Sequence, residues 1–314
     1  MYPLDLLLDR LEFRAMGCDM FAGVESASEP TLLVEVPAWS EDWEQIFSRF
    51  RLDSELSRFN QTHDQPVRVS KEFWDVFNAS RRAEKMTGGL VTSTVLDAII
   101  HAGYDRSFDM LTPQTTLEAA PIHVACRPLT TIPLNQITRE ITLPYGMSLD
   151  FGGVAKGWSA HQAMQRLQAE GPTLVDAAGD IAISGPRTDG SPWTIGVADP
   201  FHTDEEIEIL AITEGGVATS GKDRRRWMRN GILQHHIINP FTGQPAETDL
   251  LTVTVIAPDV MKAEAAAKAA FILGSKLGLE WIESQSELAG LFILESGEML
   301  YSNKMKTHLL SYTL

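Results

Sequence analysis

The segment that most constrains the fold is Asp150-Phe-Gly-Gly-Val-Ala-Lys-Gly157, which lies directly before an amphipathic run that extends to Glu170. Adjacent glycines let backbone amides approach a ligand closely, and a helix N-terminus carries partial positive charge. Apolar residues recur every three to four positions from Val154 to Leu167, and Gly171-Pro172 ends the run. The pattern predicts a glycine turn feeding a helix that could hold an anionic ligand. An ordinary strand-to-helix turn is the alternative.

The acidic character of the chain bounds its partners. The 314 residues carry a net charge of −16 and are 44% hydrophobic, which suffices for a substantial core. Nucleic acids and anionic membranes attract clustered Lys and Arg, and the one dense basic cluster, Arg224-Arg225-Arg226, is more typical of a solvated loop in so acidic a chain. We therefore expect a soluble globular protein with no nucleic-acid partner.

The cysteines and the N-terminal sequence bear on location. Cys18 and Cys126 are too few for a disulfide framework and match no zinc motif. The first ten residues include two acids and an arginine, so no apolar signal-peptide core forms, and charged residues before Cys18 disfavour a lipoprotein attachment site. No window approaches the roughly 18 apolar residues of a membrane span. We expect a cytoplasmic protein without membrane insertion.

Strand-like and helix-like segments alternate irregularly along the chain. A strand pair is expected over Phe13–Val36, with short apolar stretches around Met16-Gly17, and a hairpin is expected over 173–185 that turns at Ala178-Gly179-Asp180. Helices are expected over 39–51, 70–87, 94–102 and 260–272, the last ending at Gly274, and further strands over 140–143, 193–197, 216–221, 235–240 and 251–257, with 105–145 the most loop-like region. Runs of strands with a few inserted helices indicate the α+β class. We expect one domain over residues 1–314, with two lobes as the alternative.

Several motifs in a fixed order point to one family. Asp150–Gly157 is followed by Ala178-Gly179-Asp180, Ala218-Thr-Ser-Gly221, His236-Ile-Ile-Asn-Pro-Phe-Thr-Gly243 and an Ala-rich helix that contains Glu264. This order resembles the FAD:protein FMN transferases, the ApbE flavin transferase family, from Met16-Gly17 to Gly274. Ser54–Asn60 and Thr87-Gly-Gly89 through Tyr104 are similar to family segments that help to build the flavin pocket. The resemblance implies an α+β fold of mixed or antiparallel sheets with inserted helices and an FAD cleft.

The resemblance also implies an activity. Members split the pyrophosphate of FAD with the help of magnesium, move FMN to a threonine or serine hydroxyl of an acceptor protein and release AMP, and some relatives instead hydrolyse FAD. Such chemistry must neutralise the phosphate oxygens and take a proton from the attacking hydroxyl. FAD, an acceptor protein and magnesium are therefore the expected partners.

The same resemblance assigns roles to individual residues. His236 matches the position of the catalytic base; without the resemblance, His235 would be equally eligible, and a structural strand histidine would be the plainer interpretation. The metal contacts would be the carbonyl of Ala155 and the carboxylate of Glu264. The expected FAD-binding residues are Met16, Asn60, Tyr104, Gly152, Gly153, Lys156, Asp180, Thr219, Ser220 and Gly221.

The sequence departs from the family pattern at the metal positions. Glu264 stands where the family has aspartate, and Lys268 stands where it has a threonine or aspartate ligand. Protonated lysine has no acceptor and cannot ligate a cation, and at i, i+4 it is placed to pair with Glu264. Either the Lys268 ammonium partly replaces magnesium, or Lys268 points to solvent and Glu264 still binds the metal.

Other drifted positions weaken the expected site further. Asn239 and Thr92 stand where aspartate is usual, and Cys18 stands where threonine follows Met-Gly. A non-catalytic FAD-binding protein, or a degenerate relative with an impaired magnesium site, is therefore the alternative to a transferase.

Overall fold

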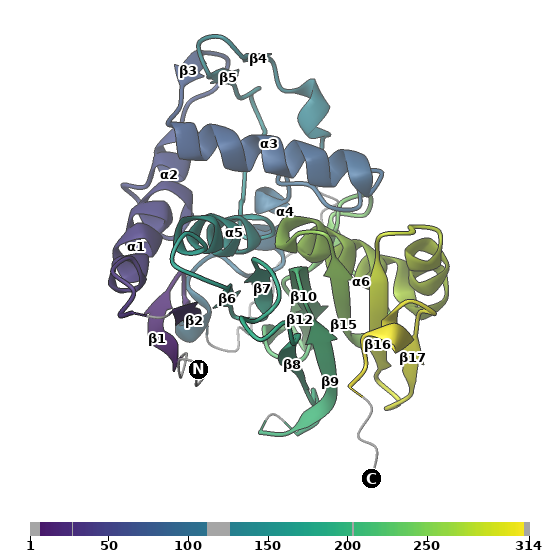
Figure 1. Cartoon of the computed structure of the whole chain (residues 1–314). Coiled ribbons are helices and arrows are strands. Elements are labelled where there is room, and N and C mark those ends of the chain that lie inside the picture. Colours follow the sequence, from purple (N-terminus) through teal and green to yellow (C-terminus); the bar gives the residue numbers. More distant parts are fainter. Residues whose placement is uncertain (1–6, 27, 112–125, 203, 311–314) are drawn as a thin grey trace. The chain divides into compact units, whose positions relative to one another are not determined.

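The eight-stranded sheet is the largest structural element of the chain. Its strands lie in the order β1 (Leu7–Ala15), β2 (Cys18–Ser26), β6 (Thr173–Ala177), β7 (Asp180–Ile183), β10 (Gly215–Gly221), β15 (Leu250–Ala257), β16 (Ala289–Leu294) and β17 (Met299–Tyr301) (Figure 1). The computed structural model describes residues 7–26, 28–111, 126–202 and 204–310. The chain folds into two compact units, the first formed by Met1–Glu41, Lys156–Ser220 and Asp249–Leu314 and the second by Asp42–Ala155 and Gly221–Thr248. The sheet belongs to the first unit.

The sheet contains two tight hairpins, of which that of β6 and β7 forms where the sequence predicts it. The strand pair expected over 13–36 lies earlier, from Leu7 to Ser26, because residues 33–36 already belong to helical turns. β1 and β2 pair from Leu7–Ser26 to Ala15–Cys18, and the two residues between them, Met16 and Gly17, both have positive φ (53° and 68°). The hairpin of β6 and β7 turns at Ala178 (φ 56°) and Gly179 (φ 90°). Two-residue loops with positive φ at both positions match the right-handed twist of antiparallel strands.

Helix α6 (Val260–Glu283) lies against β15 and β16 of the sheet (Figure 1). Its first half is rich in buried alanines, whose small side chains allow a close approach to the strands, so Glu264 is also buried. The prediction that this helix ends at Gly274 is only half right. Gly274 breaks the helix (φ 80°, ψ 173°), but helical turns resume after it, where the amide of Ser275 donates to Asp249 (3.0 Å).

The remaining elements of the first unit complete its core. They are η1 (Leu33–Glu35), α5 (Ala155–Leu167, which starts at the last residue of the second unit), β8 (Trp193–Ala198), β9 (Glu206–Ile212) and η4 (Met305–Thr307), with the first part of α1 (Val36–Phe47). β8 alternates buried and exposed residues along its length. Its inward residues join a cluster with β7, β9 and β16 that includes Trp193, Ile183 and Leu291. Burial of these side chains stabilises the unit through the hydrophobic effect.

The second unit combines short helices with small sheets. Its elements are α2 (Glu55–Phe59), α3 (Lys71–Met86), α4 (Leu96–His101), η2 (Phe108–Met110), η3 (Leu129–Thr131), the sheet β3 (Pro66–Arg68), β5 (Glu140–Thr142), β4 (Leu134–Asn135), and the hairpins β11 (Arg226–Arg229)–β12 (Ile232–His235) and β13 (Ile238–Asn239)–β14 (Gln244–Pro245). Ser70 caps α3 as predicted, accepting a hydrogen bond from the Phe73 amide (3.2 Å). The strand expected over 235–240 divides into the end of β12 and β13.

The α+β prediction, with antiparallel sheets and inserted helices, is confirmed. The pairs β1–β2, β2–β6, β7–β10, β15–β16 and β8–β9 are antiparallel, and residues 112–125 of the predicted loop-like region lie outside the described residues. One domain over residues 1–314 stays a prediction. None of the described helices has both the length and the hydropathy of a membrane span.

Candidate functional site

The glycine turn in the second unit is held by hydrogen bonds with the side chains of Asp150 and Asn60. Asp150 accepts a hydrogen bond from the Gly152 amide (2.8 Å), so this amide serves the turn itself. The carboxamide of Asn60 bonds both the carbonyl and the amide of Leu149 (2.8 Å each). Asn60, predicted to bind the cofactor, therefore positions the turn, and the role of Gly153 stays a prediction.

Four residues of the first unit form one ion-pair network. Three of them are predicted site residues, and the fourth is Lys268, which differs from the family pattern. Lys156, on the first turn of α5, pairs with Asp180 of β7, and Lys268 pairs with Glu264 one turn earlier on α6 (2.8 Å). The two carboxylates are almost completely buried, with side-chain exposures of 2% and 1%, whereas the two lysines are 18% and 17% exposed. The lysine side chains are therefore the more accessible part of the network.

The charges of this network perturb one another strongly. Burial raises the pKa of Asp180 to about 6, with the Glu264 carboxylate adding to the shift and Lys156 and Lys268 opposing it. Burial disfavours the charge on Lys156, but the neighbouring Asp180 and Glu264 carboxylates outweigh it and raise its pKa. Asp180 is the first residue of β7 and not part of the turn itself, so its ion pair, not turn formation, explains its place here.

The predicted FAD-binding residues Thr219, Ser220 and Gly221 lie on β10, the fifth strand of the eight-stranded sheet. Thr219 forms a hydrogen bond with the hydroxyl of Thr254 on β15 (2.8 Å), and Ser220 is buried. Gly221 ends the strand, and Met16 occupies the turn between β1 and β2. Contact of these residues with FAD stays a prediction.

The adjacent histidines of the second unit differ in their surroundings. His235 is buried at the end of β12, where one ring nitrogen lies 3.0 Å from the Ala246 carbonyl and the other accepts from the Ile237 amide (3.3 Å). Burial lowers the pKa of His235. His236 lies in the link to β13 and is only partly buried. With both its ring nitrogens engaged by the backbone, His235 is a structural histidine, which leaves His236 as the better candidate for a base.

Tyr104 belongs to a cluster that sequence analysis missed. The Arg49 guanidinium lies over the rings of Phe50 (4.1 Å) and Tyr104 (4.5 Å), and its Nε is 3.4 Å from Asp150. The Arg49 side chain is 7% exposed, and its Nη2 has no hydrogen-bond partner among the described residues. In the sequence, only Asp150, two residues before Gly152, pointed to this contact with Arg49, because a buried carboxylate needs a partner.

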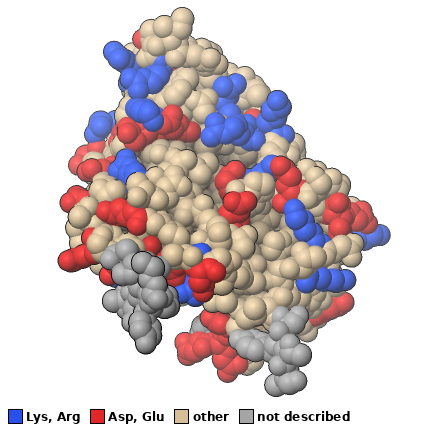
Figure 2. All heavy atoms as spheres, viewed as in Figure 1, with Lys and Arg blue, Asp and Glu red and all other residues tan. Residues whose placement is uncertain are grey.

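A cavity of about 590 Å³ in the second unit has a basic wall. Four of its lining residues are cations, namely Arg81, Arg82, Lys85 and Arg127, and Lys and Arg side chains gather over α3 in Figure 2. Gly88, Gly89 and Thr92 line it too, from the segment expected to build the flavin pocket. Thr92 donates a hydrogen bond to the buried Glu84 (2.6 Å). The cavity suits a ligand with both negative charge and apolar surface.

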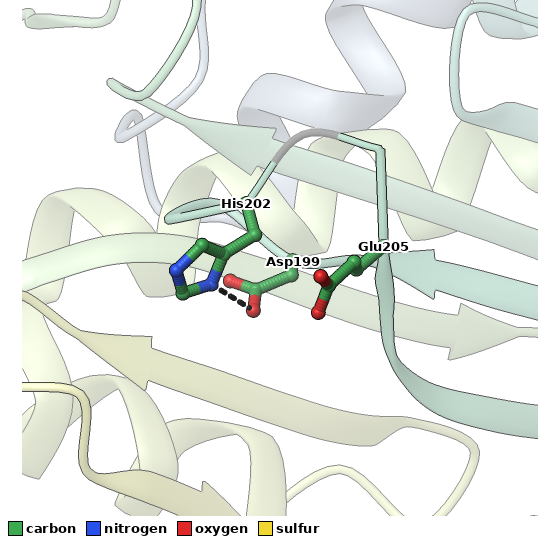
Figure 3. A group of neighbouring side chains, drawn as sticks. All are labelled: Asp199, His202 and Glu205. Atoms are coloured by element: carbon green, nitrogen blue, oxygen red, sulfur yellow. Dashed lines mark hydrogen bonds and ion pairs between the residues drawn. The ribbon is translucent and has the colours of Figure 1, made fainter.

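Three metal-binding residue types meet in the loop between β8 and β9, which the sequence did not predict. Ligand atoms of Asp199, His202 and Glu205 lie within 4.8 Å of one another (Figure 3). Asp199 accepts from the Phe201 amide (2.8 Å) and lies 3.0 Å from His202 Nδ1, and these hydrogen bonds lower its pKa. These hydrogen bonds within the exposed loop explain why the three residues lie close together, and we assign the group no metal.

Comparison with known proteins supplies a family. A family model described as the ApbE family matches residues 16–292. The chain is 29% identical over 278 residues to an FAD:protein FMN transferase of Vibrio cholerae, covering 87% of this chain and 82% of the relative, and 27% identical over 300 residues to one of Escherichia coli, covering 92% and 84%. The crystal structure of the ApbE protein of Thermotoga maritima has a TM-score of 0.86 at 24% identity, covering 97% of this chain and 100% of that one. The flavin transferase ApbE of Vibrio cholerae has a TM-score of 0.79 at 24% identity, with 96% and 100% covered.

Proposed function

The chain belongs to the ApbE family, and on this premise we propose that it transfers FMN from FAD to a threonine or serine hydroxyl of an acceptor protein. The hydroxyl oxygen forms a bond to the phosphorus of the FMN half, and the bond from that phosphorus to the bridging oxygen breaks. AMP leaves with the bridging oxygen. The main support for this proposal is the ion-pair network of the first unit, in which two partly exposed lysines pair with two buried carboxylates.

Lys156 and Lys268 would bind the phosphate oxygens. Partly buried ammonium groups stabilise charge on a phosphoryl group more strongly than solvated ones do, because little water screens them. Asp180 and Glu264 hold the two lysines in place. Fixed cations need no reorganisation when the phosphorus–oxygen bond breaks.

His236 would take the proton of the attacking hydroxyl. Histidine is the commonest general base in enzymes, and His236 is only partly buried, whereas both ring nitrogens of His235 are bonded to the backbone. The basic cavity beside Gly88 and Gly89 supports binding of an anionic ligand with apolar surface, since its wall combines cations with Pro240 and Phe241.

The residues expected to hold magnesium do not fit that ion in this chain. One Glu264 oxygen binds the Lys268 ammonium and the other accepts from the Gly157 amide (3.2 Å). Without a free carboxylate, the carbonyl of Ala155 is not enough to hold the ion, because magnesium in proteins is bound through one or two carboxylates. The proposed reaction therefore uses no metal ion. A cytoplasmic location remains a prediction.

The test follows both products of the proposed reaction. Purified protein is mixed with FAD and a threonine-containing acceptor domain, in EDTA or in magnesium chloride, and AMP is measured by chromatography and bound FMN by the mass of the acceptor. We expect AMP and modified acceptor in equal amounts, loss of both in His236→Ala with FAD binding retained, and no loss in the exposed control His202→Ala. FAD binding without AMP in either buffer would refute transfer and support the non-catalytic alternative. AMP without modified acceptor would indicate hydrolysis.

A further inference from the structure

Both carboxylate oxygens of Glu264 are already engaged by groups of the protein. Its Oε1 lies 2.8 Å from the Lys268 ammonium, and its Oε2 lies 3.2 Å from the Gly157 amide. A Cβ atom at Gly157 would lie 2.6 Å from Oε2, so glycine is what allows this close approach of α5 to the carboxylate. The Glu264 side chain is 1% exposed, so solvent barely reaches its carboxylate.

The charges of the network are already balanced. Two ammonium groups face two carboxylates, whereas magnesium in proteins is bound through carboxylates and keeps several waters in near-octahedral geometry. A magnesium ion on Oε1 of Glu264, at about 2.1 Å, would lie within roughly 5 Å of the Lys268 nitrogen. That contact is repulsive, and displacing Lys268 would leave its ammonium without the partner that neutralises it.

Both ammonium groups keep donors for a ligand. Each has three N–H groups, and among the described residues the structure shows one hydrogen bond from each, to Asp180 and to Glu264. The two lysine side chains are more exposed than the two carboxylates, so a ligand reaches the lysines more readily. This arrangement favours an anion with several oxygens, such as a pyrophosphate.

We infer that Lys268 is a tethered cation that takes the place of a divalent metal ion, so that the pyrophosphate of FAD binds to Lys156 and Lys268 without magnesium. The identity of the ligand rests on the proposed function. The exclusion of metal rests only on the network itself. Lys268 thereby becomes a ligand-binding residue that the family pattern does not contain.

Calorimetric titration with FAD tests the binding half of this inference. In wild type the affinity should agree within about twofold between EDTA and magnesium chloride. Lys268→Met should weaken binding in EDTA by about tenfold or more, because a charge-assisted hydrogen bond is lost, and magnesium should restore part of it through the released Glu264. The matched control is Lys262→Met, on the same helix, whose ammonium pairs with Glu287 at the surface. It should bind FAD like wild type.

Manganese chloride, followed by the electron paramagnetic resonance of the free ion, tests metal exclusion without FAD. Wild type and Lys262→Met should leave the ion free, and Lys268→Met should bind it. If Lys268→Met does not fold, the doubly neutral Glu264→Gln/Lys268→Met variant replaces it, and should bind FAD weakly in both buffers and no manganese. Magnesium-dependent FAD binding, or manganese binding, by wild type would overturn the inference, as would unchanged FAD affinity in Lys268→Met. Absence of FAD binding under every condition refutes the proposed function, while the manganese comparison still decides metal exclusion.

Discussion

Loss of the Lys268 charge should destabilise the first unit far more than loss of a surface lysine on the same helix. In Lys268→Met the Glu264 carboxylate, 1% exposed, keeps the Gly157 amide but loses its counter-charge. Removing one partner of a buried ion pair costs about 3–5 kcal/mol. Because the amide contact remains and Lys268 is 17% exposed, we expect the lower end, about 3 kcal/mol.

The assay is urea unfolding at pH 7 in EDTA, so that no metal ion replaces the lost charge. Lys262→Met serves as the control because its ammonium is 30% exposed and its partner Glu287 is 56% exposed, and we expect no measurable loss there. Adding Glu264→Gln to Lys268→Met removes the uncompensated charge and should return the free energy of unfolding to within about 1 kcal/mol of wild type. Equal losses in Lys268→Met and Lys262→Met, or no recovery in the double variant, would refute the account of a buried, mutually dependent pair.

Three further predictions concern the second unit, each measured by urea unfolding. Because burial lowers the pKa of His235, the unfolded chain binds more protons than the folded chain just below pH 6.5, so stability should fall as the pH drops through this range. His235→Asn should flatten this pH dependence, and an unchanged pH profile would contradict the prediction. Glu84→Leu leaves the Thr92 hydroxyl and a buried amide without their acceptor and should cost roughly 1–3 kcal/mol for each, whereas Glu84→Gln keeps an acceptor oxygen and should cost clearly less; equal costs would count against the hydrogen bonds. Arg49→Lys keeps the charge but loses stacking on Tyr104 and should cost roughly 1–2 kcal/mol; wild-type stability would exclude a contribution from stacking.

Local patterns were sufficient for most elements of the fold. The turns at Met16-Gly17 and Ala178-Gly179 depend on positive φ at neighbouring residues, and the start of α3 depends on one capping serine, all of which are short-range effects. The continuation of α6 beyond Gly274 depends instead on Asp249, which is distant in sequence and binds the Ser275 amide. A local glycine signal could not reveal that partner.

The class of the protein and the order of its motifs follow from residue identity alone. The i, i+4 spacing also shows that Lys268 can pair with Glu264, the expected metal ligand. It left open whether Lys268 points to solvent or stays with Glu264. Tertiary structure decided this, since burial of α6 removes the carboxylate from water and makes the ammonium its necessary partner. Packing likewise separated His235 from His236 and brought Arg49 to Asp150, because burial and long-range contacts are set only when the chain is folded.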